Sequence, residues 1–295
     1  MTRPLVFHIF GGPNIRASLS PTIHNAAFTH HHLPYTYTIA ECASLSEVSQ
    51  LITSPSFGGA SITMPHKLTA FEHCTEVSGS ARAIGAINTL LTTRSPNGNG
   101  AVKVKGDNTD WSGLYTLIID YLSQQGIHSG KGTGKVGLVI GAGGAARAAV
   151  YALLQAEFST IIIWNRTVGK AEDIVEDFDT LKCGGNGVEM RAVGDGGGIG
   201  PVDVVIGTIP GDVKTEEDFE GLFQGSKTGL CVEMAYKPKV TPLMKVAERR
   251  GLVVRDGLEV LLRQGFEQYR LWTGLDAPEG AMREAIGENG LESKV

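Results

Sequence analysis

The stretch from Lys135 to Thr167 constrains the fold of this chain more than any other segment. An apolar run at 136–140 leads into a glycine-rich sequence at 141–146, then an alanine-rich run ending near Gln155 and a second apolar run at 161–164. This order predicts a strand, a tight glycine turn, a helix and a second strand, which is the unit that binds a dinucleotide. Glycines allow the backbone to approach a pyrophosphate, and the helix N-terminus offers it N–H groups.

The end of the second strand indicates which dinucleotide would bind. Enzymes that use NAD usually carry an acidic residue about 20 positions after the turn, and that carboxylate would repel the 2′-phosphate of NADP. Arg166 occupies this place here, and its planar guanidinium suits a phosphate, so we expect NADP. The alternative is a solvated loop arginine that happens to follow a strand. The expected cofactor-binding residues of this unit are Gly141, Ala142, Gly143, Gly144, Ala145, Asn165, Arg166 and Thr167.

The composition excludes several classes of protein. At 295 residues, with 42% hydrophobic and 19% charged residues, the chain is long enough for two globular domains. A net charge of −5 argues against a nucleic-acid surface, so small molecules are the expected partners. The 4 cysteines are scattered without C-x-x-C pairing, which predicts no metal site and no disulfide framework. No apolar run approaches the roughly 18 residues of a membrane span, and we expect a cytoplasmic protein.

Near the N-terminus, two serines stand beside an expected helix start. Residues 5–10 form an apolar run that predicts a buried strand, and helical spacing begins after Pro21. Ser20 suits the N-cap position, with Pro21 at the first helical position. On an extended segment, Ser18 and Ser20 would also point the same way, toward a helix N-terminus that favours anions. Two hydroxyls there would bind a carboxylate.

Further candidate residues lie at the ends of expected strands and helices. The small, hydroxylated stretch 58–67 reads as a strand and a proline turn that delivers Lys67, although most lysines are simply solvated. Residues 106–111 open a helix, where Asp107, Asn108 or Asp110 would each serve equally well as a cap. Residues 207–211 follow a strand, at the edge where ligands bind in open α/β sheets.

The remaining patterns complete an α/β fold. Two apolar runs, at 202–206 and 230–234, predict further buried strands of a parallel sheet with helices between them. Asn97 to Gly100 has the composition of a hairpin tip. Asp256 to Leu258 leads into an expected helix at 259–272, which carries Gln264.

Together these motifs resemble the shikimate dehydrogenase family over almost the whole chain. The matching pieces are Ser18 to Pro21, Ser61 to Lys67, Gly85 to Thr89, Asn108 to Asp110, Gly141 to Ala145, Asn165 to Thr167 and Gly257 to Leu261. The stretches 233–238, 241–243 and 272–274 are similar to the version that forms the C-terminal domain of the fungal five-activity shikimate-pathway polypeptide. The chain is therefore also expected as part of a larger polypeptide. Related domains occur in the non-enzymatic fungal quinate repressor.

The resemblance implies a substrate domain at 1–110 and 257–295 and a Rossmann-like NADP domain at 111–256. It implies that Lys67 and Asp110 are the acid/base pair. The other residues that it implies are Ser18, Ser20, Thr63 and Tyr236 for the substrate carboxylate, Asn88 and Gln264 for the ring hydroxyls, and Thr208 and Gly257 for the cofactor. Three positions depart from the usual family pattern. Ser61 stands for an asparagine that touches substrate, His66 for an apolar or aromatic residue, and 207–210 for Asn-Ala-Thr-Ser.

The implied reaction is the NADP-dependent, reversible reduction of 3-dehydroshikimate to shikimate. Oxidation of a secondary alcohol needs a base for the hydroxyl proton as hydride leaves, and the reverse reaction needs an acid. Two alternatives stay open: a quinate/shikimate dehydrogenase of quinate catabolism and a ligand-sensing domain without catalysis. Ser20, where quinate users often carry threonine, and Arg166 argue against the first alternative. The presence of Lys67, Asp110 and the glycine turn argues against the second.

Overall fold

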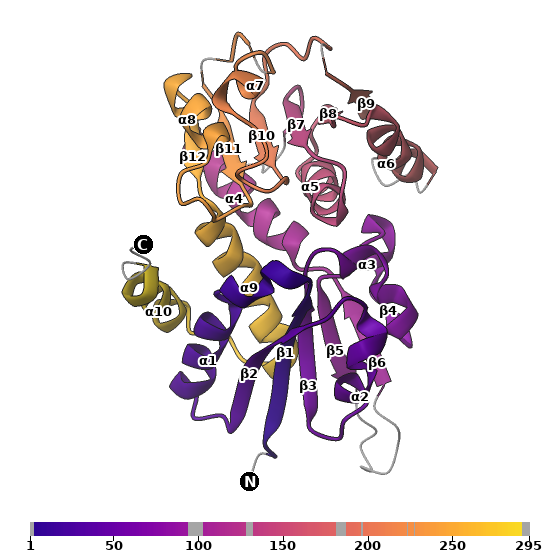
Figure 1. The fold of residues 1–295 in the computed structure, drawn as a ribbon. Helices are drawn as coiled ribbons and strands as arrows, with labels where there is room; N and C mark the ends of the chain where they lie inside the picture. Colours follow the sequence, from indigo (N-terminus) through magenta and orange to yellow (C-terminus); the bar gives the residue numbers. More distant parts are fainter. Residues whose placement is uncertain are drawn as a thin grey trace. The chain divides into compact units, whose positions relative to one another are not determined.

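A computed structural model describes residues 3–93, 103–127, 132–180, 187–195, 197–222, 224–226 and 228–290 of the chain. The chain divides into two compact units (Figure 1). The first unit comprises Met1–Thr109 and Gln264–Val295, and the second unit comprises Asp110–Arg263. In the described part of the chain, no helix combines the length and the apolar character that crossing a membrane requires.

The second unit is built on a parallel sheet that contains the predicted dinucleotide stretch. Its strands are β7 (Val136–Ile140), β8 (Thr160–Trp164), β9 (Glu189–Val193), β10 (Val204–Gly207), β11 (Leu230–Glu233) and β12 (Val253–Arg255). They pair in the order β12-β11-β10-β7-β8-β9, with every neighbouring pair parallel. Counted from β7, this is the doubly wound order of the Rossmann fold, which confirms the predicted fold class.

Helices cover both faces of this sheet because the strands are apolar on both sides. Alternate strand residues belong to two separate cores, as Val139 and Leu138 of β7 show. The first core is completed by α4 (Asp110–Gln124), α5 (Gly144–Gln155), α6 (Val168–Thr180) and the start of α9 (Gly257–Thr273). The second core is completed by α7 (Glu216–Glu220) and α8 (Pro242–Arg249).

The first unit contains a mixed sheet in the order β2-β1-β3-β5-β6-β4. The strands are β1 (Leu5–Gly11), β2 (Tyr35–Glu41), β3 (Phe57–Ile62), β4 (Glu76–Val77), β5 (Thr89–Thr93) and β6 (Lys103–Asp107). β5 runs antiparallel to both β3 and β6, while the other pairs are parallel. The predicted hairpin tip at 97–100 lies outside the described residues. The antiparallel pairing of β5 and β6 is what strands on either side of such a tip would show.

Two layers of helices also cover the first sheet. One face packs under α2 (Ser49–Ile52), α3 (Gly79–Ile84) and short 3-10 turns, including Leu45–Val48 and Ala70–His73. The other face carries an aromatic cluster that includes Phe7 of β1, Phe28 of α1 (Ser20–His30), and Tyr269 and Trp272 of α9. α10 (Glu279–Gly290) packs on α1. Burial of these large rings supplies much of the hydrophobic stabilisation of this unit.

The two units are divided inside α9, between Arg263 and Gln264, whereas the sequence analysis placed this boundary at 256/257. Val260 of α9 is buried in the first core of the second unit, so the first turns of the helix belong to that unit. The other division falls between Thr109 and Asp110, one residue before the expected position. Which ligand each unit binds stays a prediction.

Candidate functional site

The N-terminus of α1 differs from its sequence-based description. Ser20 is the first residue of the helix, not its N-cap, and the residue before it, Leu19, has helical backbone angles. Ser18 and Ser20 therefore do not alternate along an extended strand. The hydroxyl oxygen of Ser18 accepts a hydrogen bond from the backbone N–H of Ser20 at 3.2 Å, which is a local serine turn. Both hydroxyls still belong to the start of an 11-residue helix, where N–H groups favour an anion.

The turn that carries Lys67 is held by its backbone on both sides. Thr63, just after β3, donates its N–H to Phe10 at 3.0 Å. The carbonyl oxygen of Lys67 accepts the N–H of Ile87 at 2.8 Å. The backbone of the turn is thereby tied to two neighbouring segments of the first unit, and Lys67 is half-buried.

Two of the expected substrate residues of the first unit lie together. Asn88 precedes β5 and Gln264 lies in α9, and the Asn88 Nδ2 atom is 3.4 Å from the Gln264 Oε1 atom. Both side chains are buried. Thr109 links them, because its hydroxyl lies 3.0 Å from Asn88 Nδ2 and 3.3 Å from Gln264 Oε1. Three segments that are distant in sequence therefore form one polar cluster.

The sequence analysis missed the residues behind this cluster. Gln268 donates its side-chain N–H to the hydroxyl of Thr89 at 2.9 Å, and Thr89 donates to Asn88 Oδ1 at 2.7 Å. Gln268 lies one helical turn after Gln264, so i,i+4 spacing was a signal that could have found it.

The cap candidates Asp107 and Asn108 make structural contacts. Asp107 accepts from the hydroxyl of Ser78 at the start of α3, and Asn108 donates to the Ala86 carbonyl.

In the second unit, the glycine turn lies where the strand order reverses. Gly141 follows β7, and Thr208 follows the adjacent β10. A Cβ atom on Gly141 would lie 2.4 Å from the Thr208 hydroxyl oxygen, and Gly141 has φ of +121°. Only glycine fits here without strain. The Thr208 hydroxyl donates to the carbonyl of Ile140 at 2.8 Å, which holds the two strand ends together.

The start of α5 is suited to a phosphate. Its N-cap is Gly143, which supplies no side-chain cap, and a Cβ there would meet no atom within 4 Å. The first N–H groups of the helix therefore have no side-chain cap, and such groups favour a phosphate. Arg166 and Thr167 are exposed after β8, and Asn165 donates its side-chain amide to the Thr167 carbonyl at 2.8 Å. These residues fit the phosphates of NADP.

The loop after β11 carries Tyr236 and packs against Gly257. A Cβ atom on Gly257 would lie 2.6 Å from the backbone of Ala235, so this close approach requires glycine. Tyr236 itself is half-buried. Asp110 is the buried first residue of α4.

Glu233 is a buried acid that the sequence analysis did not single out. One carboxylate oxygen accepts the N–H of Ala235 at 2.9 Å, and the other accepts the hydroxyl of Thr241 at 2.9 Å. Burial raises the pKa of Glu233 to about 7, and these hydrogen bonds oppose the shift only in part. Glu233 therefore anchors both ends of the loop that carries Tyr236.

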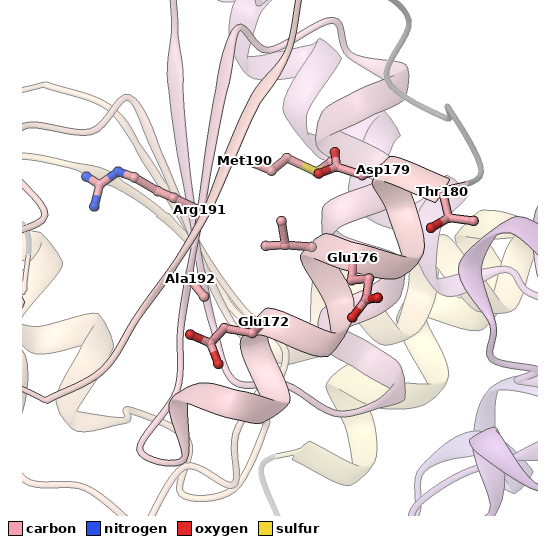
Figure 2. Close-up of a pocket in the computed structure, with 8 residues that line it drawn as sticks. Glu172, Glu176, Asp179, Thr180, Met190, Arg191 and Ala192 are labelled. Atoms are coloured by element: carbon pink, nitrogen blue, oxygen red, sulfur yellow. The ribbon is translucent and has the colours of Figure 1, made fainter.

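A hollow of about 520 Å³ lies elsewhere, between α6 and β9 (Figure 2). Its lining includes the carboxylates of Glu172, Glu176 and Asp179, and none of the expected site residues. Figure 2 shows Arg191 extending away from α6, and its guanidinium donates to the Ile199 carbonyl at 3.3 Å. Three acidic side chains would repel a phosphate, so this hollow does not fit the cofactor phosphates.

Three family models match separate parts of the chain. The shikimate dehydrogenase substrate binding domain matches residues 9–90, the shikimate / quinate 5-dehydrogenase model matches 124–190, and the shikimate 5'-dehydrogenase C-terminal domain matches 257–286. The first match carries the polar cluster up to Asn88, and the second carries the glycine turn and Arg166.

Two curated relatives share 34% of their residues with this chain. The pentafunctional AROM polypeptide of Schizosaccharomyces pombe aligns over 297 residues, which is 97% of this chain and 18% of the polypeptide. The quinate repressor protein of Emericella nidulans aligns over 316 residues, which is 96% of this chain and 35% of the repressor. The chain thus spans well under half the length of either relative.

Solved structures are also similar, and the match covers nearly all of each of these two chains. A shikimate 5-dehydrogenase from Mycobacterium fortuitum is 30% identical, with a TM-score of 0.76, over 97% of this chain and 98% of that one. The shikimate 5-dehydrogenase of Thermus thermophilus, solved with NADP(H) and shikimate, is 29% identical, with a TM-score of 0.73, over 96% of this chain and 99% of that one.

Proposed function

The chain belongs to the shikimate dehydrogenase family, and we propose that it catalyses the NADP-dependent, reversible reduction of 3-dehydroshikimate to shikimate. The observation that carries this proposal is the open glycine turn at the switch point of the second sheet, followed by the exposed Arg166. A turn of this kind binds a dinucleotide, and an arginine at the end of the second strand favours a 2′-phosphate.

In this proposal the second unit binds NADP. Gly141 to Ala145 would lie against the pyrophosphate, and Asn165, Arg166 and Thr167 would bind the 2′-phosphate and its ribose. Thr208 and Gly257 would border the same site from neighbouring loops. When bound, NADP supplies the hydride acceptor for oxidation and, in its reduced form, the hydride donor for reduction.

The first unit would bind the substrate, joined by Tyr236. Ser18, Ser20 and Thr63 are neutral donors, with the two serines at a helix start that favours an anion, so they suit a carboxylate. Asn88 and Gln264 would contact ring hydroxyls. This set of neutral polar groups is suited to a polyhydroxylated acid, because hydroxyls and carboxylates are recognised by hydrogen bonds.

Lys67 and Asp110 would form the acid/base pair. In oxidation, the base takes the proton from the substrate hydroxyl as hydride leaves, and in reduction the acid returns a proton to the new alkoxide. The backbone contact of Lys67 with Ile87 supports this role, because a proton donor must be held in place to be effective.

A direct absorbance assay for the reduced cofactor tests the proposed function. Purified protein is mixed with shikimate and NADP, and separately with quinate and NAD, and formation of reduced cofactor is followed. We expect turnover with shikimate and NADP and much slower turnover with quinate and NAD. Faster turnover of quinate with NAD would instead indicate the catabolic enzyme.

The second candidate function is a ligand sensor, and the 34% identity with the Emericella nidulans quinate repressor is the observation that favours it. No turnover with any pair, combined with calorimetric binding of shikimate or quinate, would establish the sensor and contradict the enzyme. Because the curated relatives are several times longer, we also propose that the chain works as one part of a larger polypeptide.

A further inference from the structure

The Tyr236 loop, residues 234–240 between β11 and α8, has an exposed middle and buried ends. Residues 237–240 are exposed. Glu233, the last residue of β11, is 2% exposed, and Thr241, the N-cap of α8, is 1% exposed. The side chains of these two residues meet, because the Thr241 hydroxyl donates to one carboxylate oxygen of Glu233 at 2.9 Å. A buried hydrogen bond therefore closes the base of the loop.

The backbone that leads into Tyr236 is bonded to two further groups. The other carboxylate oxygen of Glu233 accepts the N–H of Ala235 at 2.9 Å. The N–H of Met234 donates to the carbonyl of Gly207, the last residue of β10, at 2.9 Å. Both N–H groups just before Tyr236 thus have fixed partners.

Two glycines of neighbouring segments pack directly on the Tyr236 loop. A Cβ atom on Gly257 would lie 2.6 Å from the backbone of Ala235 and 2.7 Å from the backbone nitrogen of Tyr236. A Cβ atom on Gly211 would lie 2.8 Å from the carbonyl oxygen of Lys237. These distances are shorter than van der Waals contact, so no side chain fits between the loop and either glycine. The backbone is therefore held on both sides of Tyr236.

Gly207 gives the Glu233 carboxylate its place. A Cβ atom on Gly207 would lie 3.0 and 3.1 Å from the two carboxylate oxygens and 2.5 Å from a methyl carbon of Leu243. The family resemblance implies an asparagine at 207, and the side chain of an asparagine there would displace the carboxylate. The glycine at 207 therefore accompanies the position that the Glu233 side chain takes in this chain.

Capping of α8 does not by itself account for Glu233. The Thr241 hydroxyl oxygen accepts the N–H of Met244 at 3.3 Å, which is the usual contact of an N-cap residue and needs no carboxylate. Burial of a carboxylate costs free energy unless hydrogen bonds compensate for it. Glu233 makes those bonds to the two ends of the Tyr236 loop, so the ordering of that loop is what its burial provides.

We propose that Glu233 and Thr241 are positioning residues that hold the backbone of Tyr236 so that its hydroxyl meets the substrate carboxylate. This inference rests on the proposed function, which assigns Tyr236 to that carboxylate, and deepens it by naming the residues that set the contact. A hydrogen bond weakens steeply when its angle is poor, so a small displacement of the loop would weaken the contact.

Substitutions at Thr241 test the proposal. Thr241→Val keeps the shape but removes the hydroxyl that bonds to Glu233, whereas Thr241→Ser keeps it. We expect Thr241→Val to raise Kd for shikimate, measured by calorimetry, about 10-fold, and Thr241→Ser to stay near the wild type. Thr215→Val is the matched control, because it removes the N-cap hydroxyl of α7. The control should lower thermal stability by a similar amount and leave Kd unchanged.

A double-mutant cycle separates positioning from general loss of structure. If Thr241 acts through Tyr236, Thr241→Val should cause no further rise in Kd once Tyr236→Phe has removed the hydroxyl. Losses that add in the double variant would overturn the proposal. Wild-type affinity of Tyr236→Phe alone would also overturn it, since the loop would then position no ligand contact.

Substitutions at Glu233 give an independent test. An amide can accept from Ala235 and donate to Thr241, whereas a leucine side chain can do neither. We therefore expect Glu233→Gln to bind shikimate nearly as well as the wild type and Glu233→Leu to bind it at least 10-fold more weakly.

These binding measurements also separate the two proposals. A protein that shows this pattern of shikimate affinities but does not oxidise shikimate would contradict the proposed function while the positioning roles stand. A protein that oxidises shikimate, and whose Thr241→Val and Glu233→Leu variants bind it as the wild type does, would contradict the positioning roles alone.

Discussion

The Nε2 atom of His66 lies 3.0 Å from the backbone carbonyl oxygen of Cys42, and this contact ties the turn that carries Lys67 to the end of β2. A carbonyl can only accept, so the His66 imidazole donates from Nε2. His66 is buried, and the thiol of Cys42 lies 3.6 Å from the same nitrogen. His66, where the family resemblance implies an apolar or aromatic residue, therefore has a structural partner in this chain.

His66→Phe should loosen this turn, because phenylalanine fills the space but donates no hydrogen bond. We expect the free energy of unfolding to fall by about 1 kcal/mol and kcat to fall several-fold, since the carbonyl of Cys42 is left unsatisfied. Chemical denaturation and steady-state kinetics measure the two effects. His30→Phe, at an exposed position of α1, is the control. A variant with full stability and full kcat would show that the contact positions nothing.

Lys67→Met should lower turnover far more than it weakens substrate binding. Removing a general acid/base group typically lowers kcat by roughly 100-fold or more. Lys103→Met, at an exposed position of β6, should leave kcat and KM unchanged in the same assay. If kcat were kept and only KM for shikimate rose, Lys67 would be a binding residue and not the proton carrier.

Arg166→Gln should impair the use of NADP specifically. We expect KM for NADP to rise about 10-fold or more while KM for NAD changes little, because a charged hydrogen bond to the 2′-phosphate is lost. The ratio of kcat/KM for the two cofactors is the measurement, with Arg82→Gln, on the exposed surface of α3, as the control. An equal loss with both cofactors would argue against a 2′-phosphate contact.

Two glycines of the same turn should respond differently to alanine. Gly141→Ala places a Cβ 2.4 Å from the Thr208 hydroxyl at φ of +121° and should destabilise the protein by about 1–3 kcal/mol. Gly143→Ala adds its Cβ in open space, so we expect unchanged thermal stability but weaker binding of NADP, because the methyl group enters the space that we assign to the pyrophosphate. Thermal melts and cofactor titration of both variants separate the two effects. Tight binding of NADP by Gly143→Ala would show that the pyrophosphate does not lie against this turn.

Glu233 should make stability depend on pH near neutrality. Burial raises its pKa to about 7 from an ordinary 4.5, so its favourable contribution is complete below pH 4.5 and is lost as the pH rises through 7. Compared with the wild type, Glu233→Gln should therefore gain free energy of unfolding from pH 4.5 to pH 8, by on the order of 3 kcal/mol at most. Denaturant titrations at several pH values measure the difference. Glu217→Gln, exposed on α7, should show a flat difference, and the same flat result for Glu233→Gln would contradict the raised pKa.

Local sequence patterns predicted the second unit well. The apolar runs, the glycine turn and Arg166 are contiguous, and the signal that defines β7, α5 and β8 comes from residues a few positions apart. The start of α1 was predicted less well, because Ser18, Leu19 and Ser20 have the composition of both a cap and an extended segment, and only the backbone angles separate the two.

The sequence by itself determined the doubly wound sheet and the glycine turn, since each is encoded by neighbouring residues. Only the tertiary structure decided how the buried polar groups of the first unit connect. The side-chain oxygen of Asn88 accepts from the N–H of Thr109, 21 residues away, and the backbone carbonyl of Asn88 accepts from the side chain of Gln268, 180 residues away. No periodic sequence pattern predicts a hydrogen bond between such distant residues, because its geometry exists only once strands and helices have packed.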